Sequence, residues 1–231
     1  MTSVYLAATP AEAACERLRA AIEGARATRG VSHIAVAGGT TPRRTYELLV
    51  AEIDDWAGVE VWFGDERAVG PDDPESNYRM VRETLLSGGS GPLVHRIEGE
   101  RGAEEAAAAY AAELEERLPQ NDGVPVLDMA LQGLGPDGHT ASLFPGNPAV
   151  QAHGVCVPVH DAPKPPSDRI TLTVPVLRAA RSIIFLATGA EKADAVRRLL
   201  ARPDVAVPSS LLGGDRTEVI VDGAAAPPQT G

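Results

Sequence analysis

The chain has 231 residues, of which 44% are hydrophobic and 23% charged, a composition typical of a folded globular protein. Its formal net charge of −11 argues against nucleic acid or an anionic membrane as a main partner. Cys15 and Cys156 form no CxxC pair, so they predict neither a disulfide framework nor a thiolate metal site. The N-terminus lacks a basic segment followed by an apolar one, and no apolar stretch is long enough to span a bilayer. We therefore expect a soluble cytoplasmic protein.

Strand-like and helix-like segments alternate along the chain. The sequence Thr9-Pro10-Ala11-Glu12 is typical of a helix start, and Gly30 ends that first helical unit. Ser87 to Pro92 is expected to be a flexible turn, and Asp161 to Ser167 a Pro-rich surface loop. Helices are predicted from residue 9 and over 42–51, 77–86, 103–118 and 190–200. Strands or extended segments are predicted at 33–37, 59–63, 126–132, 155–159, 169–174, 182–187 and 217–221.

This alternation predicts an α/β fold with a doubly wound, mostly parallel sheet and helices on both faces, similar to a Rossmann fold. Ligands of such sheets bind at the carboxyl ends of the strands. The loops GGTTP, GDER and GPDGH each follow a predicted strand, so they are expected to converge there. No internal repeat or linker is visible, which favours a single domain over residues 1–223 and a disordered tail over 224–231.

The first of these loops, Gly38-Gly39-Thr40-Thr41-Pro42, has the composition of an anion-binding turn. Glycines let the backbone approach an anion closely, and threonine hydroxyls and the N–H groups of a helix start can bind it. An ordinary glycine turn with a threonine cap is the alternative. No GK[ST] follows, so the loop is not a P-loop.

The second loop is Gly64-Asp65-Glu66-Arg67, which places two carboxylates and a guanidinium at a strand end. These groups can position a substrate, tune a pKa, or simply form a surface ion-pair cluster. Ser76 or Asn77 then serves as the cap of the following helix.

The third loop, Gly135-Pro136-Asp137-Gly138-His139, is the strongest candidate for catalysis. A histidine in a Gly-rich loop after a strand is well placed to act as a general base, and Asp137 can hold its imidazole or contact the substrate. The alternative is a turn with an exposed histidine. Residues 133–138 also match G-x-G-x-x-G, but Pro145, Gly146 and Pro148 interrupt the chain before a long helix can form. A nicotinamide cofactor is therefore not expected.

Two cations complete the candidate set. Arg169 begins an extended segment, and Lys192 lies at a helix start, where the helix dipole disfavours a cation unless an anion binds nearby. A solvated lysine that points away from the helix end is the alternative. The other histidines, His33, His95, His153 and His160, show no metal-ligand spacing and are expected to be structural or exposed.

Taken in order, these motifs resemble the 6-phosphogluconolactonases of the oxidative pentose phosphate pathway. The similar stretches are VAGGTTPRRTYELL, VWFGDERAVGPDDPESNYRMVRETLL, LDMALQGLGPDGHTASLFPG and PPSDRITLTVPVLRAARSIIFLATGAEKADAVRRLL, which cover most of the chain from Val36 to Leu200. The architecture is shared with the glucosamine-6-phosphate deaminases. Their corresponding loop resembles DGH-x-A-F-N-E-P, with a glutamate that assists ring opening. This chain has Phe144 at that position, which favours lactone hydrolysis.

The resemblance implies a role for each candidate residue. His139 would activate water against the lactone carbonyl, Asp137 would orient His139 or the substrate, and Arg67 would stabilise the developing charge. Asp65 and Asn77 would line the pocket. The phosphate would be held by the glycine loop, which includes Gly38, Gly39, Thr40 and Thr41, together with Arg169 and Lys192.

The chemistry fits these residue types. A δ-lactone is an activated ester, so its hydrolysis requires neither a metal, a cofactor nor a covalent nucleophile. A neutral imidazole suits the proton transfer at cellular pH, and a guanidinium suits the oxyanion. The expected partner is thus a small phosphorylated sugar lactone, and the protein is expected to be a monomer or weak homodimer.

Two alternative functions remain open. One is a sugar-phosphate deaminase or isomerase on the same fold, against which Phe144 argues. The other is the effector-binding domain of a sugar-responsive transcription regulator. Such regulators carry a DNA-binding helix-turn-helix, for which this chain has no room before Val31, and the net charge also disfavours that function.

Overall fold

Seven parallel strands form the central sheet of the computed structural model, which describes residues 1–87 and 91–227. Their spatial order is β1-β12-β11-β8-β2-β3-β5, and every neighbouring pair is parallel. Strands β2 and β11 are buried along their whole length and β11 is apolar throughout, as expected of parallel strands covered on both faces. The strand bounds are β1 (Ser3–Leu6), β2 (Ser32–Val36), β3 (Val59–Phe63), β5 (Leu93–Val94), β8 (Met129–Gly133), β11 (Ile183–Ala187) and β12 (Thr217–Val221).

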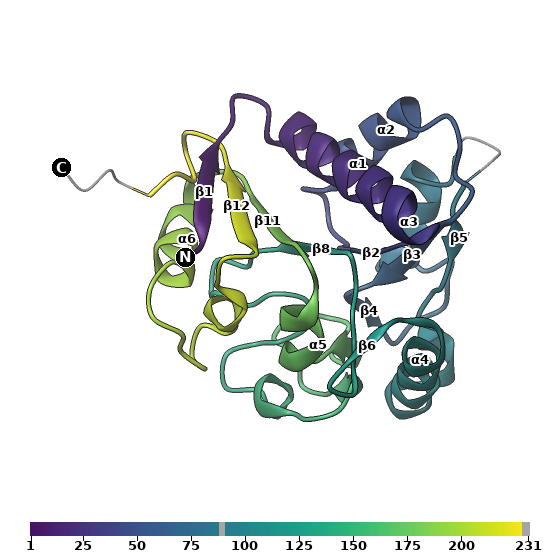
Figure 1. Cartoon of the computed structure of the whole chain (residues 1–231). Helices are drawn as coiled ribbons and strands as arrows, with labels where there is room; N and C mark the ends of the chain where they lie inside the picture. Colours follow the sequence, from purple (N-terminus) through teal and green to yellow (C-terminus); the bar gives the residue numbers. More distant parts are fainter. Residues whose placement is uncertain (88–90, 228–231) are drawn as a thin grey trace.

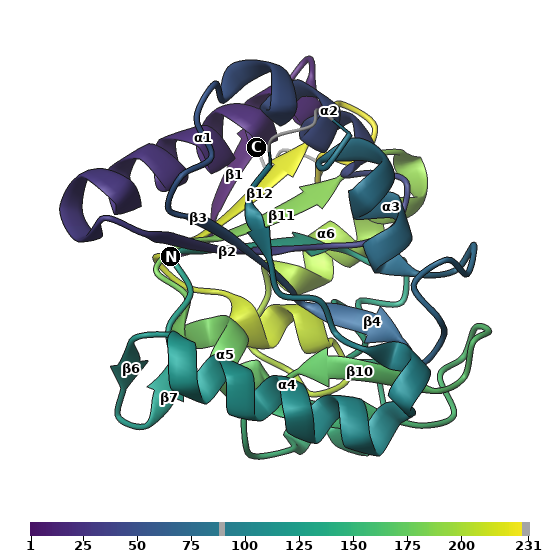
Figure 2. The same cartoon turned by 90° about the vertical axis from the view of Figure 1, so that its right-hand side faces the viewer.

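Helices cover both faces of this sheet (Figures 1 and 2), which confirms the predicted doubly wound α/β fold. One face carries α1 (Pro10–Arg29), α2 (Arg43–Glu52) and α3 (Asn77–Thr84). The other carries α4 (Ala103–Arg117) and α5 (Val174–Ala179), and the short helix η4 (Pro208–Leu212) contacts both α5 and α6 (Ala193–Leu199). Within the described part of the chain, no helix combines the length and apolar character needed to cross a membrane.

The strand order reverses between β2 and β8. From β2 the chain builds outward through β3 to β5, and from β8 it builds in the opposite direction through β11 to β12. The loops that follow β2 and β8 therefore diverge to opposite sides and leave a crevice at the carboxyl ends of the strands. This switch point is where open α/β sheets bind their ligands.

A second, antiparallel sheet lies beneath the first and was not predicted. It consists of β4 (Asp65–Arg67), β10 (Arg169–Leu172) and β9 (Cys156–Val159), in the order β4-β10-β9. The GDER segment is thus a strand that pairs with β10. The predicted extended segment over 169–174 was too long, because β10 ends at Leu172 and α5 begins at Val174 with a proline in its first turn.

The two ends of the chain also differ from expectation. Strand β1 was not predicted, because it is an exposed edge strand without a buried apolar face. Residues 224–227 were assigned to the disordered tail, but Ala225 is fully buried and its N–H donates to the Asp222 carboxylate. The rest of that tail, 228–231, and the centre of the predicted 87–92 turn lie outside the described residues.

Of the four histidines outside the GPDGH loop, His33 and His95 are buried. The His95 ring stacks on Trp62 at 3.9 Å, with Glu60 and Glu113 within hydrogen-bond distance of its two nitrogens. His33 lies beside the same tryptophan. Within residues 1–87 and 91–227, no group of three or more His, Cys, Asp or Glu side chains could hold a metal ion.

The remaining elements are short. They are the strands β6 (Gln120–Asn121) and β7 (Val124–Pro125) and the 3-10 helices η1 (Gly99–Arg101), η2 (Pro148–Gln151) and η3 (Ala190–Lys192).

Candidate active site

A cavity of about 230 Å³ opens at the switch point, and the loops after β2, β3, β8 and β11 all contribute to its wall. Nine of the eleven residues singled out in the sequence line it. Thr40 is not part of the lining, and Asp137 reaches the cavity through its contact with His139. The sequence-predicted lining residues are Gly38, Gly39, Thr41, Asp65, Arg67, Asn77, His139, Arg169 and Lys192.

Two arginines face each other across the β4–β10 pair. Arg67 and Arg169 are direct register partners, and both line the cavity. Like charges directly opposite each other destabilise a strand pair unless an anion lies between them. Burial lowers the pKa of the Arg169 guanidinium, and the neighbouring charge of Arg67 lowers it further. The pair is therefore arranged to attract an anion.

Within the described residues, neither guanidinium has a carboxylate partner of its own. Arg169 donates to the carbonyl oxygens of Lys164 and Pro166, at 3.0 Å each, and Arg67 donates to the carbonyl of Glu75. Among the residues that the structure describes, no ion pair within 4.0 Å involves Arg67, Lys164, Arg169 or Lys192. These four cations form a local positive site in a protein whose overall charge is negative.

Lys164 is a cavity residue that the motifs did not reveal. It lies on the Pro-rich segment that the sequence assigned to a surface loop, and Arg169 holds that segment through its carbonyls. Lys192 ends η3 immediately before α6, close to the predicted helix start. Burial lowers the pKa of the Lys192 ammonium, Lys164 lowers it further, and Glu191 and Asp137 oppose this effect. Lys164 and Lys192 are the only lysines in the chain, and this rarity is the sequence feature that could have identified Lys164 as a site candidate.

The acidic side of the cavity is a buried network around Asp65. Its carboxylate accepts a hydrogen bond from Ser142 at 2.6 Å and another from the Asn77 amide at 3.1 Å. Asn77 also donates to the Asp65 carbonyl, which fixes the orientation of the amide. Gly38 makes room for this amide, since a Cβ atom there would lie 1.8 Å from Asn77 Oδ1. The network ties β4, α3 and the catalytic loop together.

Glu66, next to Asp65 in β4, anchors the start of α3. Its buried carboxylate accepts hydrogen bonds from the N–H groups of Asn77 and Tyr78, at 2.7 Å each, and from the Ser76 hydroxyl. Carboxylates are stabilising at a helix N-terminus because the N–H groups there lack intrahelical partners. Glu66 is thus structural, while its neighbours Asp65 and Arg67 face the cavity.

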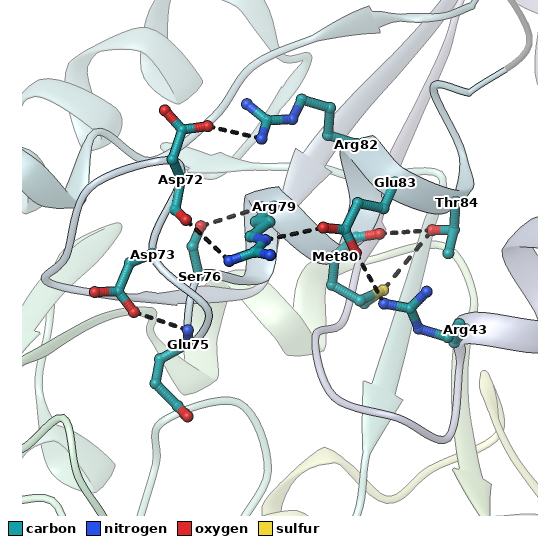
Figure 3. Close-up of polar contacts among 10 residues, drawn as sticks. All are labelled: Arg43, Asp72, Asp73, Glu75, Ser76, Arg79, Met80, Arg82, Glu83 and Thr84. Carbon is teal, nitrogen blue, oxygen red and sulfur yellow. Dashed lines mark hydrogen bonds and ion pairs between the residues drawn. The ribbon is translucent and has the colours of Figure 1, made fainter.

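Surface contacts hold the same helix from outside (Figure 3). The Ser76 hydroxyl accepts from the N–H of Arg79 and caps α3, as predicted, and Arg79 also donates to the Asp72 carbonyl and to Glu83. Glu83 in turn pairs with Arg43 at the start of α2. The helices that follow the glycine loop and the GDER strand are therefore linked on the protein surface.

Asp137 and His139 form a side-chain pair in the loop after β8. Asp137 Oδ1 lies 2.5 Å from His139 Nδ1. A carboxylate can only accept a hydrogen bond here, so the proton of a neutral imidazole is held on Nδ1 and Nε2 is available to accept another. Burial raises the pKa of the Asp137 carboxyl, but its contacts with His139 outweigh that effect and the net shift is downward. Asp137 therefore stays ionised beside the imidazole.

Hydrogen bonds from η4 and α6 to backbone carbonyls hold this loop. The carbonyl of Gly138 accepts from the N–H of Ser209 in η4, and Arg198 of α6 donates to the carbonyl of Pro136. Within the described chain, the G-x-G-x-x-G stretch opens no α-helix and passes instead into a bridge between Thr140 and Leu143. It lacks the helix N-terminus that binds a dinucleotide pyrophosphate, which agrees with the expectation from its prolines.

Two larger hollows on the surface lack these features. One, of about 430 Å³, includes Arg96 and Arg101, but both guanidiniums already pair with nearby glutamates. Another, of about 600 Å³, has no lysine or arginine in its lining, which includes Asp137, Phe144 and four prolines. Uncompensated charge next to a poised histidine, rather than volume, identifies the candidate active site.

These features define a doubly wound α/β protein whose switch-point cavity suits an anionic small molecule. The family model of the glucosamine-6-phosphate isomerases/6-phosphogluconolactonase matches residues 7–221, and the chain belongs to that family. Relatives named 6-phosphogluconolactonase from Streptomyces coelicolor and Homo sapiens are each 39% identical to it. The first alignment covers 94% of this chain and 89% of the relative, and the second covers 86% and 79%.

Solved structures show the same relationship. The 6-phosphogluconolactonase from Trypanosoma cruzi superposes with a TM-score of 0.88 at 30% identity, covering 100% of this chain and 98% of that one. A monomeric glucosamine-6-phosphate deaminase superposes with a TM-score of 0.81 at 20% identity, covering 97% and 98%. The second comparison shows a shared fold, as the sequence predicted.

Gly135 leaves the space that the Asp137–His139 pair occupies, and we predict that Gly135→Ala disrupts this pair. A Cβ atom there would lie 2.0 Å from His139 Nδ1 and 2.6 Å from Asp137 Oδ1. We expect kcat to fall about a hundredfold or more, the scale of losing a general base, while circular dichroism stays unchanged. Gly24→Ala on α1, where a Cβ meets nothing within 4 Å, is the matched control. Unchanged kcat in Gly135→Ala would contradict the role of the pair.

Proposed function

We propose that this chain hydrolyses 6-phospho-D-glucono-1,5-lactone to 6-phospho-D-gluconate, the second step of the oxidative pentose phosphate pathway. The observation that carries the proposal is a histidine with Nδ1 fixed by a carboxylate, in a cavity lined by four cations that have no carboxylate partner among the described residues. An anionic substrate would supply the missing charge. The family and the names of the relatives support the same activity.

In the proposed mechanism, His139 Nε2 accepts a proton from a water molecule as that water attacks the lactone carbonyl. Asp137 holds the imidazole in the reactive tautomer and stabilises the imidazolium that forms. Collapse of the tetrahedral intermediate breaks the ring C–O bond, and the imidazolium returns its proton to the departing alkoxide. The carboxylic acid that forms releases the second proton of the attacking water to solvent. The product then carries a carboxylate and a free hydroxyl, and the steps need neither a covalent enzyme intermediate nor a metal ion.

We divide the cations between the oxyanion that develops at the lactone carbonyl and the phosphate group of the substrate. We assign the oxyanion to Arg67, which lies on β4 beside Asp65 and Asn77. We assign the phosphate to Arg169 and Lys192 with the backbone of Gly39 and the side chain of Thr41. Thr40, which the resemblance included, is left out of this set because it does not line the cavity.

Phe144 favours a lactonase over a deaminase. The centroid of its buried ring lies 4.7 Å from the centroid of the His139 ring. The Arg169 guanidinium lies over the Phe144 ring, with Cζ 5.4 Å from the ring centroid. An apolar side chain between the base and the phosphate cation supplies packing but no proton. A glutamate that assists ring opening is therefore replaced by a group that only positions its neighbours.

Direct assay tests the proposal. Freshly generated 6-phosphogluconolactone is followed spectrophotometrically beside glucosamine 6-phosphate, and we expect hydrolysis above the uncatalysed rate with the first compound. Ammonia release from the second would establish a deaminase and overturn the proposal. Binding of sugar phosphates without turnover of either compound would favour the effector-binding alternative.

Removing the proposed base gives the sharpest mutational test. His139→Ala is expected to lower kcat by at least about a hundredfold, because the attacking water then loses its proton acceptor. Asp137→Asn is expected to lower kcat with little change in KM, since an amide that donates to Nδ1 favours the tautomer with its proton on Nε2. Steady-state kinetics measures both effects. Near-normal turnover in His139→Ala would eliminate the assigned role.

The phosphate assignment predicts a different kinetic signature. Arg169→Ala is expected to raise KM about 10- to 100-fold, because a hydrogen bond to a charged group contributes about 1.5–3 kcal/mol. Hydrolysis of unphosphorylated glucono-1,5-lactone serves as the control, and its rate should change much less. Equal losses with both lactones would indicate damage to the loop that Arg169 holds, and would count against a phosphate contact.

A further inference from the structure

The peptide bond that leads into Asp137 is held from outside the loop by a side chain of α6. A terminal nitrogen of Arg198, Nη2, donates to the carbonyl oxygen of Pro136 at 3.1 Å, across 62 residues of sequence. Within the described chain, Arg198 is the only hydrogen-bond partner of that carbonyl. Because a peptide unit is planar, a contact that fixes the direction of its oxygen also fixes the direction of the next Cα atom, which is that of Asp137.

The proline ring leaves ψ of Pro136 as the backbone rotation that this contact controls. The ring restricts φ to about −65°, so the direction of the carbonyl depends on ψ. Other peptide units of the turn have backbone partners: the N–H of Gly138 donates to the Gly135 carbonyl, and the Gly138 carbonyl accepts from Ser209, each at 3.0 Å. Arg198 therefore controls the rotation that these backbone hydrogen bonds leave unfixed.

Arg198 is itself held against the turn. Its Nε lies 3.0 Å from Oδ2 of Asp194, four residues earlier in α6, and its side chain is only 30% exposed. A Cβ atom on Gly138 would lie 3.4 Å from Nη2 of Arg198 and 2.9 Å from Cγ1 of Val207. The guanidinium is thus packed against the turn as well as hydrogen-bonded to it.

We propose that Arg198 is a positioning residue for the Asp137–His139 pair. By fixing ψ of Pro136, it directs the Asp137 carboxylate toward His139 Nδ1, where the two side chains lie 2.5 Å apart. The imidazole is thereby kept in the tautomer that has its proton on Nδ1 and leaves Nε2 free to accept. The inference rests on the proposed function, in which Nε2 accepts the proton of the attacking water.

Kinetics of Arg198→Met test the catalytic consequence. Methionine keeps a long apolar side chain but has no donor for the Pro136 carbonyl. We expect kcat to fall about 10- to 100-fold, the scale of a slightly misplaced catalytic group, while KM changes little because the cations assigned to the phosphate stay in place. Unphosphorylated glucono-1,5-lactone should lose the same factor, which distinguishes this variant from Arg169→Ala. Arg198→Lys, which retains a cationic donor, should recover part of kcat.

NMR of the ring nitrogens of His139 observes the tautomer without any turnover. In the wild-type protein we expect the neutral ring to show a protonated Nδ1 and a bare Nε2. In Arg198→Met the signals should shift toward a mixture of the two tautomers, because Asp137 no longer points steadily at Nδ1. Loss of the signals in His139→Ala assigns them.

Arg197→Ala is the matched control. Arg197 lies next to Arg198 on the same helix and also pairs with Asp194, at 2.5 Å, but its side chain is 62% exposed. Among the described residues it makes no hydrogen bond or ion pair with the loop, so its removal should change neither kcat nor the His139 signals. Circular dichroism of every variant checks that it is folded.

Unchanged kcat in Arg198→Met, unchanged His139 signals in that variant, or equal losses in Arg197→Ala would each overturn the proposal. The two readouts also separate this inference from the proposed reaction. A wild-type protein without lactonase activity, but with a His139 tautomer that depends on Arg198, would overturn the proposed reaction alone. Normal lactonase activity with a tautomer that does not depend on Arg198 would overturn this inference alone.

Discussion

The positive site at the switch point is the constraint on which the function of this fold depends. Arg67 and Arg169 face each other across β4 and β10, and neither is neutralised by a carboxylate among the described residues. Folding places these charges together at an electrostatic cost, which the antiparallel pairing and the carbonyl acceptors of Arg169 offset. The cost is recovered when an anion binds. A protein with a net charge of −11 can thus still attract an anionic substrate locally.

Opposite this charge, the fold holds one imidazole in one tautomer. The Asp137 carboxylate fixes Nδ1 of His139, Gly135 leaves the space for both side chains, and η4 and α6 hold the loop carbonyls from outside. Phe144 packs near both His139 and Arg169, so the apolar residue that distinguishes this loop from a deaminase loop also joins the base to the cationic side. The proposed base and the proposed phosphate cation therefore belong to a single packed unit.

Local sequence was sufficient for much of the fold. Apolar runs such as residues 59–63 and amphipathic repeats such as the first helix correspond to β3 and α1, because burial on both faces or on one stripe leaves a clear periodic pattern. Elements without such a pattern were missed. The exposed edge strand β1 has no buried face, and β4 consists of Asp-Glu-Arg, whose extended conformation depends on pairing with β10, about a hundred residues later.

The sequence by itself determined the family resemblance and indicated the GPDGH loop, the glycine turn and the cations Arg169 and Lys192 as site candidates, because each is a short motif or residue type with its own chemistry. The tertiary structure alone decided which groups meet. It set Arg67 against Arg169, joined Ser142 to Asp65, brought Lys164 beside Lys192, and left Thr40 outside the cavity. Strand register and loop closure over long sequence separations produce these contacts, and no local pattern records them.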